Sequence, residues 1–227
     1  MAGGNSRQER VVLASQRSRD SGLLRLRLVR RMKDISETYT YQTITEMASW
    51  YENFHNRIIT EVTGDIENHI KLATFAILSP GMDPESNMVA TQTVINNVLN
   101  GESISNIKAY PHMVRIAREI VITGDTTLIK GPKTRSFYKS LMTKGKTDDA
   151  AVDRWAAREF SPYDKKIKVK QSNGTYKEAW RDVTLTLGEY RKFQGRIQTA
   201  AEYLGIYAAE LQAILWVDRR ARENSRS

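Results

Sequence analysis

The sequence predicts an all-α protein that carries one small β-hairpin. Apolar residues recur at every third or fourth position through most of the chain, which is the spacing of amphipathic helices. Gly, Pro and Asn-Gly breaks separate these runs, so each break ends one helix and begins the next. Residues 165–180 instead alternate apolar with charged residues around a Ser-Asn-Gly turn, and we expect this insertion to be a β-hairpin.

The chain has 227 residues, which fits one domain behind an N-terminal arm. We predict that residues 1–40 form a basic, partly disordered arm, because residues 1–20 hold few large apolar side chains to bury. Up to Asp34, nine Lys or Arg stand against three acidic residues. The arm is either a solvated tail or an extension that follows phosphates. Residues 23–32 fit a short strand or the start of an amphipathic helix.

Residues 41–227 are predicted to form the helical domain, which opens with a series of helices. The helical runs cover residues 43–62, 66–78, 84–99 and 111–122. Asp65 is expected to cap the second run, and Asn100-Gly101 ends the third. The aromatic residues of the first run are most simply core residues. The second run is almost continuously apolar and is expected to be a central buried helix that stops at Ser79-Pro80.

A helical hairpin is predicted at residues 125–142. Gly131 would supply a left-handed helix cap, and Pro132 suits the first turn of the following helix. The first amides of that helix have no internal partner, so they could bind a phosphate oxygen together with nearby hydroxyls and cations. The side chains expected around these amides are Lys133, Thr134, Arg135 and Ser136.

The rest of the chain is predicted to hold a further helix start, the β-hairpin and two closing helices. Asp153 stands at an otherwise apolar helix start. In the β-hairpin, Lys166, Lys168 and Lys170 alternate with apolar residues, so the hairpin either reaches a DNA groove or is a solvated insertion. Residues 185–204 and 208–222 form the closing helices, which are joined near Gly205.

Composition excludes several classes of site. Cysteine is absent, which rules out disulfides, zinc–thiolate sites and four-cysteine iron–sulfur clusters. The three histidines (His55, His69 and His112) do not pair at metal-ligand spacing, so we expect neither a metal nor another cofactor. No apolar run approaches the roughly 18 residues of a membrane span, and no signal peptide is evident, so we expect a cytoplasmic protein. The net charge of +9 and the pI near 9.7 favour a polyanionic partner.

Two short motifs resemble the helix-hairpin-helix DNA glycosylase superfamily. Leu128-x-x-Gly131-x-x-x-Arg135 is similar to the family's Leu-Pro-Gly-Val-Gly-x-Lys-Thr-Ala hairpin. Val152-Asp153 is similar to the Val-Asp of its Val-Asp-Thr-His segment, whose Asp is catalytic. The chain departs from the family at Lys133, which replaces the second hairpin glycine, and at Arg154-Trp155, which replaces Thr-His. Without cysteine, the chain resembles short phage-type members that lack an iron–sulfur cluster.

The resemblance implies roles for particular residues. Asp153 would be the catalytic carboxylate, although from local sequence it could equally only cap its helix. Arg135 stands where strand-cutting members have Lys, and a guanidinium does not lose its proton in proteins, so we expect an intact backbone after base removal. The implied DNA-binding residues are Gly131, Pro132, Lys133, Thr134, Ser136 and Arg154. The implied base-pocket residues, each of which could instead be structural, are Ser79, Phe137, Tyr138 and Trp155.

These inferences predict a monomeric, monofunctional DNA glycosylase that removes a damaged or modified base flipped out of double-stranded DNA. A carboxylate beside the sugar would stabilise the oxocarbenium-like transition state and orient water. Two alternatives stay open: a non-catalytic helix-hairpin-helix DNA-binding protein, and a base-modifying enzyme of a DNA hypermodification pathway. A viral protein of this kind would work in the host cytoplasm or at the nucleoid.

Overall fold

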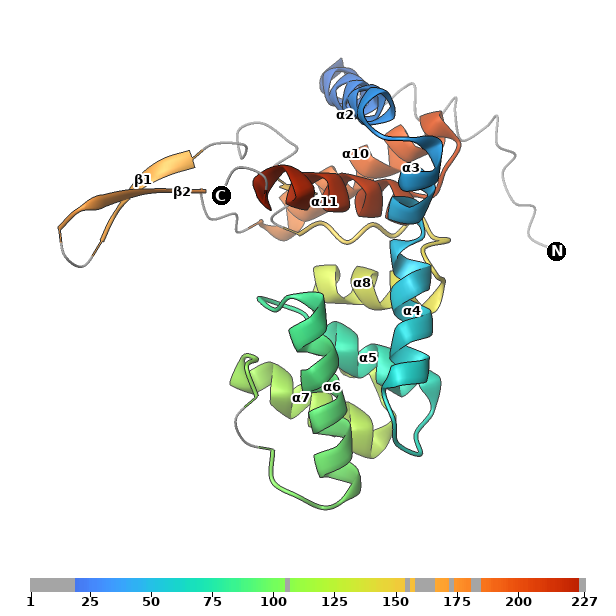
Figure 1. The fold of residues 1–227 in the computed structure, drawn as a ribbon, viewed down its shortest axis with the longest axis vertical. Helices are drawn as coiled ribbons and strands as arrows, with labels where there is room; N and C mark the ends of the chain where they lie inside the picture. Colours follow the sequence, from blue (N-terminus) through green and yellow to red (C-terminus); the bar gives the residue numbers. More distant parts are fainter. Residues whose placement is uncertain are drawn as a thin grey trace.

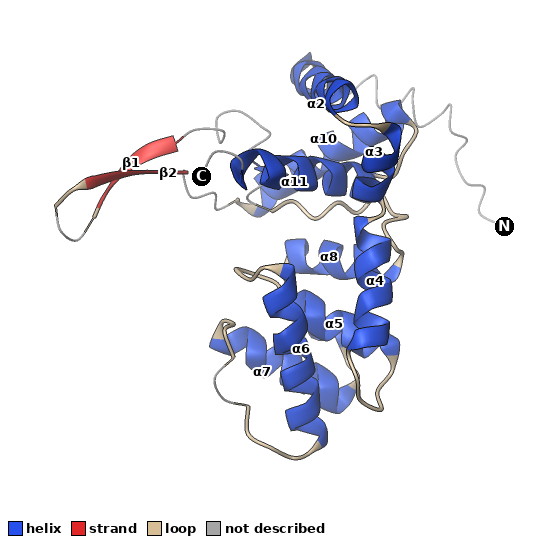
Figure 2. Ribbon diagram, in the orientation of Figure 1, coloured by secondary structure: helices blue, strands red, loops and turns tan. Residues whose placement is uncertain are grey.

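The computed structural model describes residues 19–104, 107–153, 156–157, 166–171, 174–180 and 185–224. Its helices form two lobes, one above the other in Figure 1. The helices of the lower lobe are α4 (Trp50–Glu61), α5 (Asn68–Leu78), α6 (Pro84–Leu99), α7 (Pro111–Thr123) and α8 (Pro132–Met142). The helices of the upper lobe are α2 (Arg19–Thr38), α3 (Tyr41–Ala48), α10 (Leu187–Leu204) and α11 (Ala208–Asn224). The prediction of an all-α protein is confirmed, since helix makes up the body of both lobes (Figure 2).

Each lobe has its own hydrophobic core. The first core is formed by helices α4, α5, α6, α7 and α8. The second is formed by α2, α3, α10 and α11 together with Ala150, Val152, Ala156 and Ala157. α11 serves both, because Ala209 and Ala213 pack into the first core while Leu211 and Leu215 pack into the second. Any cavity between the lobes is therefore bordered by α11.

The predicted helix over residues 43–62 is two helices, α3 and α4, which meet at Ser49. The Ser49 amide donates to the carbonyls of Met47 and Thr45, while its φ of −78° and ψ of 5° leave the α-helical region. The break changes which core the chain faces: Met47 is buried in the second core, and Tyr51 belongs to the first. Periodicity alone could not show this, because apolar spacing continues through the break.

The prediction that residues 1–40 form an arm is wrong for the part that α2 occupies. Leu28 and Ile35 are buried in the second core, with Met32 packed beside them. These three positions are four and three residues apart, which places them on one helix face. The arginines between them hid this spacing, so the helical interpretation of residues 23–32 was the correct one. Residues 1–18 lie outside the described part.

Most other predicted helices are confirmed within a few residues. α6 begins with Pro84 at its first turn and ends at Leu99, as predicted, and α7 extends one residue past the predicted end. α5 differs at its start: it begins at Asn68 with Glu67 as the capping residue, so the expected cap by Asp65 is wrong. α10 carries a capping box in which Thr186 and Glu189 bond each other's backbone amides.

The predicted β-hairpin is confirmed as β1 (Lys166–Lys170) and β2 (Tyr176–Trp180). The strands are antiparallel, with Lys166 opposite Trp180 and Lys170 opposite Tyr176. The hairpin projects sideways from the upper lobe (Figure 1). Within the described residues, no helix is long and apolar enough to cross a membrane.

A buried carboxylate ties α2 to α11. Asp218 has a side chain that is only 2% exposed, and it pairs with Arg31 of α2 at 2.5 Å and with Arg222 of its own helix at 2.9 Å. The two cations offset the cost of removing this carboxylate from water, and replacing Asp218 would take a charge partner away from both arginines. This ionic contact therefore links two helices that both contribute to the second core.

Replacing Asp218 by Ala should lower the free energy of unfolding by about 3 kcal/mol, because it breaks this buried pair. Urea denaturation followed by circular dichroism would measure the change. The matched control is Glu37→Ala, which removes an exposed ion pair between Glu37 and Lys33, both on α2. It should cost no more than about 0.5 kcal/mol. Equal losses in the two variants would contradict the role given to Asp218.

Candidate functional site between the lobes

The chain that follows α8 carries Asp153 into the boundary between the lobes. Lys144 and Gly145 adopt left-handed conformations, with φ of 53° and 82°, and reverse the chain after the helix. Residues 150–152 then run between the two lobes with their side chains buried. Asp153 comes directly after this buried stretch, so its position is fixed by the packing of the residues before it.

Asp153 begins a turn of helix and also lines a pocket. Its backbone carbonyl accepts a hydrogen bond from the Ala157 amide at 2.8 Å, and its Oδ1 accepts one from the Ala156 amide at 2.8 Å. The helix-capping role is therefore present. Among the described residues nothing donates to Oδ2, and the side chain lines the pocket. One carboxylate oxygen fixes the side chain, and the other is available to a ligand.

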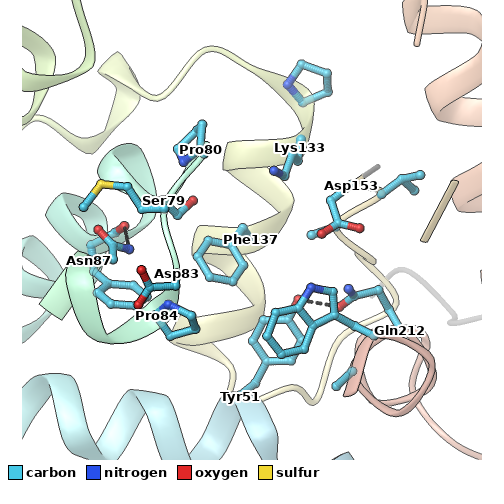
Figure 3. Close-up of a pocket in the computed structure, with 18 of the residues that line it drawn as sticks. Tyr51, Ser79, Pro80, Asp83, Pro84, Asn87, Lys133, Phe137, Asp153 and Gln212 are labelled. Atoms are coloured by element: carbon cyan, nitrogen blue, oxygen red, sulfur yellow. Dashed lines mark hydrogen bonds between the residues drawn. The ribbon is translucent and has the colours of Figure 1, made fainter. Parts of the chain in front are cut away.

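The pocket has a volume of about 820 Å³ and is lined by both lobes (Figure 3). The lower lobe contributes residues 79–84 after α5, Asn87 of α6, and Phe137 of α8. The upper lobe contributes Tyr190 of α10 and Gln212 of α11. A cavity of this size accepts a ligand as large as a nucleotide.

Aromatic side chains from both lobes form much of the pocket wall. They are Trp50, Tyr51, Phe75, Tyr110, Phe137, Tyr190 and Trp216. The rings of Trp50 and Trp216 meet edge to face, with centroids 5.2 Å apart, so this contact also joins α4 to α11. The guanidinium of Arg220 lies 4.8 Å above the Trp216 ring, and Arg220 lines the pocket as well. Such a wall favours planar ligands, which stack on aromatic faces.

A buried phenol lies below Asp153. The Tyr51 hydroxyl donates a 2.6 Å hydrogen bond to Gln212 Oε1, which links α4 to α11 (Figure 3). Burial raises the pKa of Tyr51, and the negative charge of Asp153 raises it further. Tyr51 therefore stays protonated and remains a donor. Gln212 in turn lines the pocket together with Asp153 (Figure 3).

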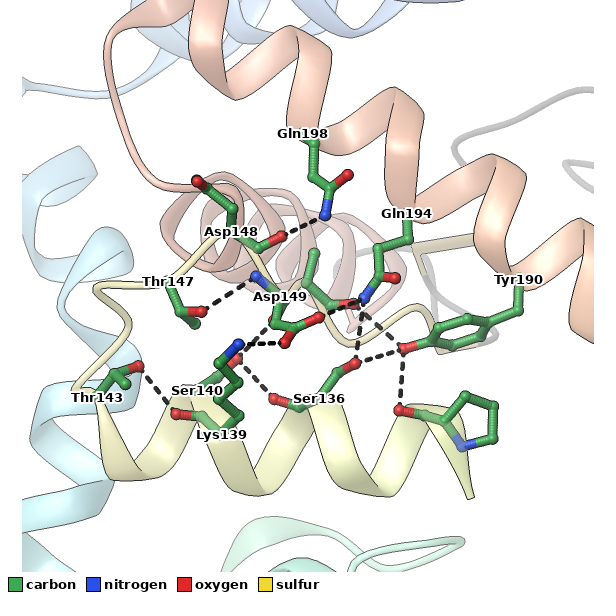
Figure 4. A network of polar contacts seen from close by, with 12 residues as sticks. Ser136, Lys139, Ser140, Thr143, Thr147, Asp148, Asp149, Tyr190, Gln194 and Gln198 are labelled. Carbon is green, nitrogen blue, oxygen red and sulfur yellow. Dashed lines mark hydrogen bonds and ion pairs between the residues drawn. The ribbon is translucent and has the colours of Figure 1, made fainter. Parts of the chain in front are cut away.

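The hydroxyl of Tyr190 connects the Asp153 segment to α8 (Figure 4). It lies within hydrogen-bond distance of the carbonyls of Ala150 and Pro132, at 3.2 and 3.4 Å, and of Ser136 Oγ at 3.1 Å. It also accepts the Val152 amide at 3.4 Å. Burial raises the pKa of this phenol. One side chain of α10 thus fixes residues 150–152 against the start of α8.

Gln194, one turn further along α10, strengthens the same junction. Its Nε2 donates to Ala150 O at 3.0 Å, to Ser136 Oγ at 3.1 Å and to Asp149 Oδ1 at 3.2 Å. The other oxygen of Asp149 pairs with Lys139 of α8 at 2.6 Å. The segment before Asp153 is therefore held from both sides, by α8 and by α10 (Figure 4).

Lys133, rather than Arg135, faces the pocket. Lys133 lines it together with Pro132 and Phe137, whereas Arg135 does not. Arg135 is exposed, and its Nε donates to the Ile129 carbonyl at 3.3 Å, which braces the turn before α8. Two residues along a helix correspond to a rotation of about 200°, so positions 133 and 135 face opposite sides. The structure therefore does not bring Arg135 to the pocket that Asp153 lines.

The predicted hairpin consists of the 3-10 turn η1 (Thr126–Leu128), a short loop and α8. Gly131 precedes α8 with φ of −64°, so it is extended, and the predicted left-handed cap is instead Gly124 at the end of α7, with φ of 71°. Thr134 and Ser136 are buried, and Ser136 bonds to α10. Neither hydroxyl is at the surface, which contradicts the expectation that they bind a phosphate.

The residues predicted to form the base pocket are partly brought together. Ser79 and Phe137 line the pocket, as expected. Tyr138 does not; it is half-buried against the first core, and this burial raises the pKa of its hydroxyl. Trp155, also predicted here, and Arg154, predicted to bind DNA, lie outside the described residues.

Local sequence patterns carry little signal for the remaining pocket residues. Trp50, Tyr51 and Trp216 have the spacing of ordinary core residues in amphipathic helices, so periodicity could not separate wall from core. Gln212 had a weak signal, because it interrupts an otherwise apolar run over residues 211–217. In the part of the chain that is described, no cluster of three His, Cys, Asp or Glu side chains could hold a metal ion.

The fold and the site define a two-lobed helical protein in which two carboxylates, two cations and an aromatic wall share one pocket. The chain belongs to a family of unknown function, DUF7178, whose model matches residues 14–224. No curated protein and no solved structure matches the chain.

Replacing Tyr190 by Phe should loosen the Asp153 segment without unfolding the protein. Loss of the hydroxyl should cost about 1 kcal/mol and leave the Val152 amide unpaired. Hydrogen–deuterium exchange should then be faster in the peptide covering residues 149–157. Tyr203→Phe, an exposed position on the same helix, is the control. Unchanged exchange in Tyr190→Phe would show that the hydroxyl does not hold the segment.

Proposed function

We propose that the protein is a monofunctional DNA N-glycosylase of the helix-hairpin-helix type. The main support is the position of Asp153, which lines an aromatic pocket between two helical lobes, beside the first turn of α8. The sequence motifs around Gly131 and Asp153 resemble that superfamily, and the pocket is lined by residues of both motifs, Asp153 and Lys133. The family match itself carries no function, so the proposal rests on the site and on the motifs.

Asp153 has the surroundings that this chemistry requires. As the bond between base and C1′ breaks, positive charge develops on the sugar, and a nearby carboxylate stabilises it. Oδ1 is held by the Ala156 amide, so Oδ2 is the oxygen that would face the sugar or a water molecule. As the base departs it takes up a proton from solvent, while water adds to C1′ and gives its own proton to the Asp153 carboxylate, so that the products are the neutral base and the abasic sugar. No step needs a metal.

The cations of the pocket suit the phosphates on either side of an extruded nucleotide. Lys133 comes from α8 and Arg220 from α11, so they approach the pocket from different lobes. The carboxylates of Asp153 and Asp83 also line the pocket, but Asp83 is engaged in capping α6 through the Ser86 amide. The net charge of +9 adds a long-range attraction for DNA.

An exposed aromatic residue at the pocket rim is our candidate for filling the gap that an extruded base leaves in the duplex. Tyr110 lines the pocket yet is 54% exposed, so it lies at the rim. Leu187 is 52% exposed and lines the pocket from the upper lobe. Base flipping leaves an empty space in the stack that an apolar side chain can occupy. We assign this role to Tyr110, whose ring can stack on the neighbouring bases.

Replacing Asp153 by Asn should reduce base release by about a hundredfold or more, because the developing charge loses its carboxylate. Purified protein would be incubated with duplexes that carry different damaged or modified bases, and released base would be measured by mass spectrometry. Binding to the same duplexes should persist. The matched control is Asp148→Asn, an exposed position of the same segment. If no duplex loses a base but all are bound, the protein is a DNA-binding module instead.

Replacing Lys133 by Ala should lower base release by about tenfold, because its charge faces the pocket. Arg135→Ala is the matched control, and it should change release by less than about twofold because it points away from the pocket. Single-turnover rates would compare the two. The abasic product should keep an intact backbone, and borohydride should trap no protein–DNA adduct. A trapped adduct that Lys133→Ala abolishes would overturn the monofunctional assignment.

A further inference from the structure

The end of the pocket opposite Asp153 has a distinct chemical character. In Figure 3, Ser79, Asp83 and Asn87 lie on one side of Phe137 and Asp153 lies on the other. All three belong to the lower lobe, at the end of α5 and the start of α6. We call Ser79, Asp83 and Asn87 the acceptor end, because each of them lines the pocket and carries a side-chain oxygen.

Asn87 is the most informative member of the acceptor end. It is 1% exposed, and its Nδ2 donates to the Phe75 carbonyl at 2.9 Å. This bond fixes the orientation of the amide, since a flipped amide would place two oxygens against each other. Its Oδ1 is buried and has no hydrogen-bond partner among the described residues. Buried polar atoms are rarely left unpaired in proteins, so this oxygen calls for a partner that arrives with a ligand.

Ser79 and Asp83 are also limited to accepting hydrogen bonds. The Ser79 hydroxyl donates its single proton to the Ala76 carbonyl at 2.9 Å, which leaves only lone pairs for a ligand. The Asp83 carboxylate accepts the Ser86 amide at 2.9 Å, and contacts with Ser86 lower the pKa of Asp83, so it stays ionised. At the rim, the Tyr110 hydroxyl lies beside Gly81 and is the group here that can donate.

We propose that the acceptor end selects a base whose edge away from the sugar carries N–H donors. Adenine-, cytosine- and guanine-type bases, including their modified forms, meet this requirement through an amino group. Thymine- and uracil-type bases place carbonyl oxygens on either side of one N–H, and these oxygens would face the lone pairs of Ser79 and Asn87. The assignment of the sugar to the Asp153 end, and hence of this edge to the acceptor end, rests on the proposed glycosylase function.

The geometry also explains how the ring is oriented. Phe137 lies between the two ends in Figure 3 and offers a surface on which a planar base can stack. A base stacked there with its sugar bond toward Asp153 directs its opposite edge toward Ser79 and Asn87. Recognition of the base and chemistry at the sugar would then lie on opposite sides of Phe137.

The test uses the full chain and free bases that carry a methyl group at the sugar-bonding nitrogen. Trp50 and Trp216 line the pocket, so quenching of their fluorescence reports binding. 9-Methyladenine, 1-methylcytosine and 9-methylguanine should bind at least about tenfold tighter than 1-methylthymine and 1-methyluracil, because a site built around hydrogen bonds rejects ligands that leave its groups unpaired. In Asn87→Leu this preference should fall to less than about twofold.

Thr91→Val is the matched control. Thr91 lies one turn further along α6, is fully buried and also has an unpaired oxygen, but it does not line the pocket. It should therefore keep the preference of the wild type. Circular dichroism would confirm that both variants fold, and Asn87→Ala, which also removes the oxygen, would replace Asn87→Leu if the larger side chain prevents folding.

The possible results separate this inference from the proposed function. Preference for amino bases without base release from any duplex would support the acceptor end and overturn the glycosylase. Release of a thymine- or uracil-type base from duplex DNA would support the glycosylase and overturn the acceptor end. Equal binding of all bases, no binding of any, or a preference that survives Asn87→Leu would also overturn the acceptor end.

Discussion

The candidate site depends on one constraint: the chain that carries Asp153 has to cross the boundary between two hydrophobic cores. Residues 150–152 have no room to move there, because their side chains are buried and their backbone is bonded to Tyr190 and Gln194 of α10. Ser136 of α8 shares both partners. A polar network inside the protein is stable only when its members are satisfied together, so α8, α10 and this segment are fixed as one unit.

The pocket follows from the same division into lobes. α11 contributes side chains to both cores, and the pocket lies at the boundary between them. The side chains at this boundary are large, flat rings together with the polar groups of Gln212 and Asp153. Trp50 and Trp216 bring the lobes together at one place, and Tyr51 and Gln212 do so at another. The space left beside these contacts is where we propose that an extruded base is held.

The proposed functions assign a different part of the pocket to each task. The Asp153 side would act on the sugar, the aromatic wall would stack the base, and the acceptor end would read its far edge. Lys133 and Arg220 would meet the phosphates from opposite lobes. This division requires both lobes at once, and the contacts between α4 and α11, Trp50 with Trp216 and Tyr51 with Gln212, join them beside the pocket.

The sequence by itself determined the helical class, the bounds of α6 and α7, the β-hairpin, and Asp153 as a residue of interest. These features depend on local spacing, on Pro and Gly at helix ends, and on turn residues, all of which neighbouring positions reveal. Tertiary structure decided the rest. Leu28 and Ile35 belong to a core because α10 packs against them, Lys133 faces the pocket because of how α8 is rotated, and Ser136 is buried because α10 covers it. Each outcome depends on a partner distant in sequence, whose contacts no local pattern contains.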